Sequence, residues 1–440
     1  MITATIGRML LDAYNEREGT QYSARTFFTE KFCPLFFDHH KYMMTAGNSP
    51  LENPKLSWGD MMMGKKPWET QEQRAERFAK LMAKIDAGVN DASVARGFPI
   101  TDVEGTTSGQ VTDMTMPLTQ NDVMLSWIGD ALGIGVQGGF SLLFFFKPVL
   151  LDIFDGWKLY RESLEGNHLL KGNQINAWNA KWLAHFENSK EFVSSDPMAG
   201  FDPFTVKEDG MMSINSVSWT EILISIARKY KNAQMMGYAY SIGQMNTTLG
   251  FLPFSLAQIR RPLQLYVRYF GIDQSKKAES LWGTGMGFRR ACQYGAIGLF
   301  AMMPKGLEKY IRQGENMPKP AKNKEQQRNY NVYQIWLLAM LNNDELWDKS
   351  QELAQLLLKA SVDKNKKIST KSGNLVNEML AAANKKQFVC AATNVTPYLE
   401  DAATLVDMVK EVHQMPNDNV PYFLALVRFQ YATMEKQNNK

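Results

Sequence analysis

The sequence predicts an α+β protein: a mixed, loop-rich N-terminal body with short strands, followed by a C-terminal four- or five-helix bundle. Before about residue 320 the chain is rich in Gly, Asn, Gln and aromatic residues, with short apolar runs and many turns. After Pro318 and Pro320 the pattern becomes helical and stays helical. The predicted domains are therefore residues 1–320, the α+β body, and residues 325–440, the bundle.

The first half of the body shows several patterns of secondary structure. Apolar residues at helical spacing predict helices within residues 1–46 and a further helix over residues 70–86. Residues 97–121 are expected to form a long polar loop with short strands. Residues 132–146 predict a Gly-rich turn that runs into a buried strand, and residues 148–164 predict a helix.

The second half of the body alternates polar stretches with regular elements. Residues 172–182 are a polar stretch that mixes amides with indoles, and residues 188–216 are expected to form a loop. Ser218, with Glu221 three residues later, predicts the N-terminus of an amphipathic helix. Residues 237–254 predict two strands joined by a polar turn.

The C-terminal part has clear helix boundaries. Asn342 with Glu345 predicts the start of a helix. Residues 364–374 are expected to form a linker. Further helices are predicted at residues 373–387, 398–413 and 420–436.

Charge is distributed unevenly along the 440 residues. The chain carries a net charge of +4 and 45% hydrophobic residues, so a large core is expected. Residues 255–329 contain 14 Lys and Arg against 5 Asp and Glu, so the remainder carries −5 (+4 minus +9). This basic segment indicates either a polyanion-binding site or a solvated surface balanced by acidic neighbours.

The cysteines and the apolar runs bear on the compartment. Cys33, Cys292 and Cys390 form no CxxC pair, which favours free thiols in a reducing compartment. The N-terminal stretch is charged where a signal peptide would be apolar. The run from Phe140 to Phe154 is too short and too polar to span a bilayer. We therefore expect a soluble cytoplasmic protein with no membrane partner.

No catalytic, cofactor or metal motif emerges from the sequence. Adjacent His39 and His40 diverge on one element, so they are poorly suited to share a metal. No P-loop and no GxSxG motif occurs. The glycines near residue 135 precede a strand, whereas a dinucleotide fingerprint needs a helix there. These observations favour a binding protein over an enzyme, with no cofactor.

The polar residues suit nucleic acid. Asn and Gln can pair with base edges, Gly allows close backbone approach, and Lys and Arg bind phosphates. On the helix after Ser255, Arg260, Gln264 and Arg268 are expected to share one face with Arg261 beside it, while Leu263, Val267 and Phe270 face a core. Trp178 is a candidate for stacking on a base. The predicted nucleic-acid-binding residues are Lys41, Asn48, Lys65, Lys66, Gln110, Gln137, Gly138, Gly139, Asn173, Gln174, Asn246, Arg260, Arg261, Arg268, Arg289, Arg290 and Lys305.

The chain resembles the large subunit of type I CRISPR effector complexes (Cascade), as a divergent member. The resemblance lies in the loop-rich body with its C-terminal bundle and in two stretches, FFTEKFCPLFFDHHKYMMTAGNSPLENP and VHQMPNDNVPYFLALVRFQYA. It implies a non-catalytic subunit of a crRNA-guided antiviral surveillance complex that reads a short protospacer-adjacent motif (PAM) in duplex DNA and helps open the target. The implied partners are crRNA, double-stranded target DNA, the other Cascade subunits and a helicase-nuclease.

Two other classes remain open at this point. One is an enzyme with an unrecognised carboxylate site, for instance a nuclease using Asp102, Glu104 and Asp113. The other is a protein-only scaffold whose bundle binds helices of other proteins.

Overall fold

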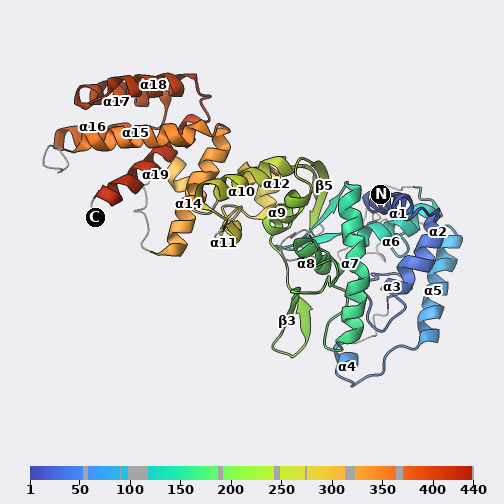
Figure 1. Cartoon of the computed structure of the whole chain (residues 1–440). Helices are drawn as coiled ribbons and strands as arrows, with labels where there is room; N and C mark the ends of the chain where they lie inside the picture. Colours follow the sequence, from blue (N-terminus) through green and yellow to red (C-terminus); the bar gives the residue numbers. More distant parts are fainter. Residues whose placement is uncertain are drawn as a thin grey trace. The chain divides into compact units, whose positions relative to one another are not determined.

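The computed structural model confirms the α+β class: helices dominate, and the strands form small antiparallel sheets (Figure 1). The chain divides into two compact units, Met1–Leu256 (unit 1) and Ala257–Lys440 (unit 2). The structure describes residues 1–52, 58–89, 91–97, 117–186, 192–241, 248–272, 275–312, 323–362 and 370–438.

Unit 1 contains a four-stranded antiparallel sheet among helices. Its strand order is β1-β2-β5-β6, and β3 and β4 form a separate pair. Strand β2 pairs centrally, with Leu142 opposite Ala239 of β5. The strands predicted at residues 132–146 and 237–254 therefore lie side by side. The strands are β1 (Ile134–Val136), β2 (Phe140–Phe144), β3 (Phe204–Val206), β4 (Met212–Ile214), β5 (Gln234–Ser241) and β6 (Thr248–Ser255).

The helices of unit 1 include those that the sequence predicted. Ser218 accepts a hydrogen bond from the backbone N–H of Glu221, as expected of an N-cap. The helices are α1 (Ile2–Glu18), α2 (Ala24–Phe27), the π-helix η1 (Phe28–Phe32), α3 (Cys33–Phe36), α4 (Trp58–Met62), α5 (Gln71–Asp86), α6 (Gln120–Ala131), α7 (Lys147–Gly166), α8 (Ile175–Phe186) and α9 (Trp219–Lys229).

Helices α1 and α6 cross with their backbones in contact because each helix has a glycine at the crossing point. A Cβ atom added to Gly7 would lie 2.0 Å from the carbonyl oxygen of Leu125, and one added to Gly129 would lie 1.8 Å from that of Thr3. No side chain fits at either position. The crossing therefore depends on the two glycines, which bring α1 directly against the buried helix α6.

Two predictions for unit 1 were wrong. The polar stretch at residues 172–182 lies largely in the buried helix α8. Its amide and indole side chains form hydrogen bonds with other residues of unit 1. Trp178 is fully buried and donates to the carbonyl of Gly156 (2.9 Å), so it offers no face to a base. Within the stretch predicted as loop, β3 and β4 pair through Phe204 and Ile214.

Unit 2 is built of helices and begins much earlier than predicted. Its boundary lies at Ala257 rather than near residue 320. The helices are α10 (Leu256–Phe270), α11 (Ser275–Glu279), α12 (Phe288–Gln293), the 3-10 helix η3 (Phe300–Met302), α13 (Leu307–Arg312), α14 (Lys324–Leu341), α15 (Glu345–Ser361), α16 (Thr370–Leu380), α17 (Lys385–Val395), the 3-10 helix η4 (Thr396–Tyr398), α18 (Ala402–Gln414) and α19 (Val420–Asn438).

The early boundary has a clear cause in the contacts of α14 and α19. The fully buried Trp336 donates to the carbonyl of Leu299 (3.0 Å). Tyr333 donates to the carbonyl of Lys305 (2.6 Å), and Arg428 donates to that of Tyr310. The segment before residue 313 thus completes the core of the C-terminal helices, which the change in composition at residue 320 does not reveal.

Helix boundaries in unit 2 also differ in detail from the prediction. Asn342 ends α14 in the left-handed conformation (φ 51°) instead of starting α15. The helix predicted at residues 373–387 is two helices, because Asn384 caps α17 through the N–H of Gln387 (3.0 Å).

We predict that Gly7→Ala destabilises the protein by about 1–3 kcal/mol, because a methyl group would push the α1 and α6 backbones apart. Chemical denaturation followed by far-UV circular dichroism measures the change. Gly166→Ala on α7 is the control, since a Cβ there meets nothing within 4 Å. Equal effects of both substitutions would show that the crossing is not tightly packed.

We also predict that a fragment of residues 257–440 folds cooperatively, whereas residues 325–440 alone do not. The shorter fragment lacks the partners of Trp336, Tyr333 and Arg428. Thermal melts of both fragments test this. A cooperative melt of the shorter fragment would contradict it.

Candidate nucleic-acid interface

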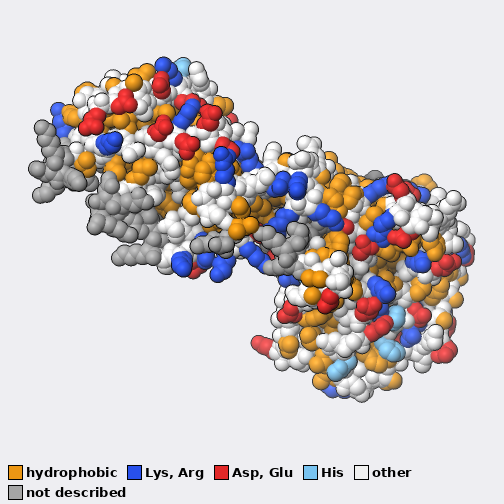
Figure 2. Space-filling model, viewed as in Figure 1, with side chains coloured by type: hydrophobic (Ala, Val, Ile, Leu, Met, Phe, Trp, Pro, Cys, Tyr) orange, Lys and Arg blue, Asp and Glu red, His pale blue; other side chains and the backbone are white. Residues whose placement is uncertain are grey.

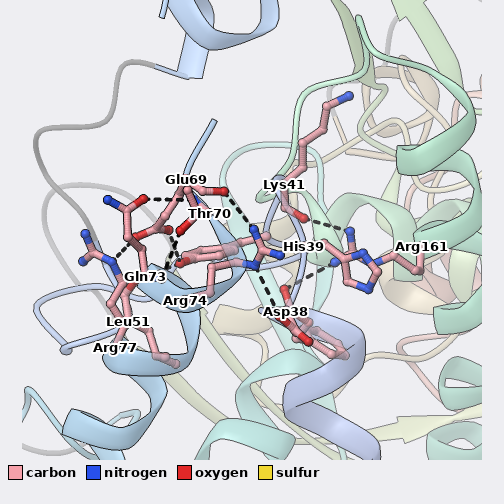
Figure 3. A network of polar contacts seen from close by, with 12 residues as sticks. Asp38, His39, Lys41, Leu51, Glu69, Thr70, Gln73, Arg74, Arg77 and Arg161 are labelled. Atoms are coloured by element: carbon pink, nitrogen blue, oxygen red, sulfur yellow. Dashed lines mark hydrogen bonds and ion pairs between the residues drawn. The ribbon is translucent and has the colours of Figure 1, made fainter. Parts of the chain in front are cut away.

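In the described part of unit 1, an exposed loop packs on buried polar side chains. We call residues 41–52 the Asn48 loop. The buried Tyr42 donates from its hydroxyl to the carbonyl of Leu51 (3.1 Å) and lies 3.4 Å from a carboxylate oxygen of Glu69 (Figure 3). Burial, followed by the charge of Glu69, raises the pKa of Tyr42 and keeps the phenol protonated. The two ends of the loop are therefore held together from beneath.

Glu69 is itself held by α5. It forms an ion pair with Arg77, which also donates to the carbonyl of Glu52 (3.0 Å). Thr70 caps α5 through the N–H of Gln73, so the N-terminus of this helix is fixed beside the loop. A carboxylate that is almost fully buried needs such a partner. The network thus orders the Asn48 loop from its two ends.

The tip of the loop is a tight turn with an exposed Gly-Asn pair. The N–H of Ser49 donates to the carbonyl of Ala46 (3.2 Å), and a carboxylate oxygen of Glu52 accepts from the N–H of Ala46 (2.9 Å). Gly47 has φ 59°, and a Cβ atom on it would lie 2.7 Å from Arg96. The positive φ favours glycine here, and a larger residue would also have to displace the end of the Arg96 side chain. Asn48 is exposed beside it.

Arg96 links this turn to the α1–α6 crossing. Its guanidinium pairs with Asp130 of α6 (2.8 Å). Its backbone N–H donates to Ser126 of α6 (2.8 Å), and its carbonyl accepts from Thr3 of α1 (2.7 Å). Because both helices hold the residue beneath Gly47, the turn rests on the rigid part of unit 1.

The structure brings predicted residues 173 and 174 beside the Asn48 loop, but uses them internally. The N–H of Asn173 donates to the carbonyl of Tyr42 (2.8 Å), and Asn173 has a left-handed backbone (φ 59°). Gln174 accepts from the N–H of Ile214 (2.9 Å) and donates to the carbonyl of Lys171 (2.6 Å). Both side chains are partly buried. Asn173 contacts the loop through its backbone, and its side-chain Oδ1 is buried without a hydrogen-bond partner.

Lys41 is a buried structural cation, which corrects its prediction as a phosphate contact. Its ammonium donates to the carbonyls of Asn167 (2.7 Å) and His168 (2.9 Å) at the end of α7. The neighbouring Arg161 is also buried and donates to the carbonyls of Leu35 and Lys41 (both 2.9 Å). These donors satisfy backbone carbonyls after the end of α7 and in the segment 35–41.

The adjacent histidines serve the same support. Asp38 pairs with Arg74 (3.2 Å), and Nδ1 of His39 lies 2.9 Å from Glu165 (Figure 3). Burial and the charge of Arg161 lower the pKa of His39. His40 stacks on Trp68, with ring centroids 5.4 Å apart. In the described ranges, no three His, Cys, Asp or Glu side chains gather as a metal site would require.

The other predicted residues of unit 1 lie at separate places. Gln137, Gly138 and Gly139 form the exposed turn between β1 and β2, where φ values of 93° and 76° require the glycines. Lys65 and Lys66 are exposed after α4, and Lys66 pairs with Asp60 (3.1 Å). The remaining two candidates, Gln110 and Asn246, lie outside the described residues.

The basic residues of unit 2 are mostly exposed. Arg289 and Arg290 are exposed on α12, and Lys305 is exposed before α13. Figure 2 shows Lys and Arg side chains over the α10–α12 part of unit 2, and charges of both signs over the later helices. This distribution gives unit 2 a surface suited to a polyanion.

The buried face of α10 differs from the predicted one. Ile259, Leu265 and Tyr266 are buried, whereas Val267 is 38% exposed. Arg261 and Arg268 both reach Asp344, at 2.7 and 2.8 Å. The pair that shares a face is therefore Arg261 with Arg268. The buried face differs from the predicted one because α10 contacts α15, and a contact between segments so distant in sequence leaves no local sequence pattern.

The sequence does not mark Arg96, Glu69 or Asp344 as functional residues. Each is an isolated charged residue without a motif, and each gains its role from a partner that is distant in sequence. The only available signal was the Gly47–Asn48 pair itself, because a Gly-Asn turn needs a scaffold to be rigid.

We predict that the free energy of unfolding of the wild type, minus that of Lys41→Met, increases as pH rises from about 8 to 10.5. Burial, aided by Arg161, lowers the pKa of Lys41 to about 8. Between that value and the ordinary lysine pKa, the unfolded chain binds more protons, so the wild type gains up to about 1.4 kcal/mol per pH unit. Urea denaturation of both proteins at pH 7.5 and 10 measures the difference. If the free energy of unfolding of the wild type, minus that of the variant, decreases between pH 7.5 and pH 10, the ammonium stabilises the fold and the prediction is wrong.

Comparisons with known proteins add no relative. No family model, curated protein or solved structure matches this chain. Among the helices in the described part of the chain, none has the length and apolarity needed to cross a membrane.

Proposed function

We propose that this chain is the non-catalytic large subunit of a type I CRISPR effector complex, and that it recognises a short motif in duplex DNA. The observation that carries the proposal is the Asn48 turn: an exposed Gly-Asn pair that lies against Arg96, in a loop whose ends are joined by the Tyr42–Glu69–Arg77 network. Glycine lets the backbone approach a groove, and an Asn side chain can both donate to and accept from base edges.

A second feature supports the proposal independently. The exposed arginines and lysines of unit 2 suit contacts with phosphates, which hold a duplex in position without reading it. In this division of labour, base pairing with crRNA reads the target, and the protein reads only the short duplex motif. The proposed partners are crRNA, target DNA, other Cascade subunits and a helicase-nuclease, and the proposed compartment is the cytoplasm.

The competing functions make different predictions in one binding experiment. A nuclease using Asp102, Glu104 and Asp113 would cut DNA when divalent metal is added; these three carboxylates lie outside the described residues. A protein-only scaffold would bind no nucleic acid at any salt concentration. An effector subunit binds duplexes in a salt-sensitive manner and leaves them intact.

We predict that Asn48→Ala relaxes discrimination between duplexes by about 1–3 kcal/mol while nonspecific affinity stays nearly unchanged, because one base-edge contact is lost. Selection of bound duplexes from a randomised pool, followed by fluorescence anisotropy on selected and scrambled duplexes, measures it. The experiment uses the full chain, with and without crRNA.

The matched control is Gln71→Ala, which removes an exposed amide at the start of α5. It should leave discrimination intact. If Asn48→Ala weakens binding to all duplexes equally, Asn48 is a positioning contact. If the wild type selects no motif with or without crRNA, the proposed reading function is wrong.

A further inference from the structure

The carboxylate of Asp344 is held between two arginines of α10. It receives Arg261 at 2.7 Å and Arg268 at 2.8 Å. The arginines are seven residues apart, so two helical turns place them on one face. One carboxylate thus neutralises at most one of two converging guanidinium groups, which are geometrically suited to bind an oxyanion.

Asp344 is not needed for the local structure around it. Its side chain makes no capping hydrogen bond to α15, and the N–H of Glu345 donates to Asn343 instead (3.1 Å). Helices α10 and α15 are joined by Trp347, which stacks on Tyr269 (centroids 4.4 Å apart) and meets Phe270 edge-on (5.9 Å). The two ion pairs can therefore open while the helices stay together.

The arginine face retains binding capacity that Asp344 does not use. The Nε atom of Arg261 is buried and has no acceptor. Among the described residues, no acceptor lies within reach of Arg260, one residue earlier. Residues 257–272 and 275–312 contain ten Lys and Arg, against only Glu279 and Glu308. An incoming anion would meet donors and positive charge in excess.

We propose that Arg261 and Arg268 form a binding site for backbone phosphates of nucleic acid, and that Asp344 occupies this site in the free protein and is displaced by phosphate. The side chains of Arg261, Arg268 and Asp344 are 29%, 62% and 34% exposed, so solvent weakens their ion pairs enough for exchange. A backbone phosphodiester presents two non-bridging anionic oxygens, as a carboxylate does, so it can take the place of Asp344 on both guanidinium groups. This inference rests on the proposed nucleic-acid function. It adds that Asp344 of the protein itself competes with phosphate for the two arginines.

The surrounding charge favours a nucleic acid over an acidic protein segment. Arg289, Arg290 and Lys305 extend the positive surface of unit 2 beyond the pair held by Asp344. A regularly repeating polyanion can use such a spread of cations, and it releases counterions as it binds.

The first test compares Asp344→Asn with Asp407→Asn in the full chain. Both substitutions remove one negative charge, and Asp407 pairs only locally with Lys410 on α18. Asn remains a good residue at a helix N-terminus, so α15 should persist. We expect Asp344→Asn to bind a labelled 30-base-pair duplex about three- to tenfold more tightly than the control, because up to two ion pairs no longer compete with phosphate. Equal affinities of the two variants would overturn the proposal.

The second test asks whether phosphate displaces Asp344 in the wild type. We expect Arg261→Gln with Arg268→Gln to weaken duplex binding and to flatten the slope of log affinity against log salt by about two, for two lost phosphate contacts. If Asp344 clamps both arginines permanently, the slope stays unchanged and the proposal fails. Melting temperatures of all variants verify that the fold is intact.

Poly-glutamate serves as the alternative polyanion. If Asp344→Asn binds poly-glutamate with the same gain as DNA, the site belongs to an acidic protein partner and the proposal is wrong. The outcomes also separate this inference from the proposed function. A wild type that selects a DNA motif, with variants that behave alike, refutes only the phosphate site. A wild type that binds no duplex at any salt refutes both.

Discussion

Unit 1 depends on the close crossing of α1 and α6, where Gly7 and Gly129 bring two backbones into contact. From this crossing the constraint extends to the functional surface. Thr3 of α1 and Ser126 of α6 fix the backbone of Arg96, whose guanidinium lies beneath Gly47. A close helix pair is stiff because its packing leaves no side chain free to rearrange. The exposed Asn48 turn therefore lies against a residue that is held by a contact between two backbones.

Positive charge has opposite roles in the two units. In unit 1, Lys41 and Arg161 are buried, and backbone carbonyls accept their hydrogen bonds. In unit 2, arginines and lysines cover an exposed surface, and one carboxylate restrains two of them. Residue type alone does not distinguish these roles, because the desolvation of a cation depends on what the rest of the chain places around it. A predicted phosphate contact can thus prove to be a structural cation.

Asp344 shows how a binding surface can carry its own competitor. The basic segment recognised in the sequence ends at residue 329, and the carboxylate that pairs with Arg261 and Arg268 lies outside it. That charge lies at the start of α15, and an aromatic contact through Trp347 brings α15 to α10. Ion pairs that are partly exposed stabilise such a contact little. They can nevertheless determine which groups are available to an incoming polyanion.

The sequence by itself determined the α+β class, most helix positions, the strands near residues 140 and 240, and Asn48 as a candidate binding residue. These follow from local periodicity, capping residues and turn chemistry, which act over a few residues. Only the tertiary structure decided that residues 257–312 belong with the C-terminal helices, that Trp178 is core, that Lys41 is internal, and that Asp344 faces Arg261 and Arg268. Each of these depends on partners tens of residues away or more, and burial and pairing at that range leave no local pattern.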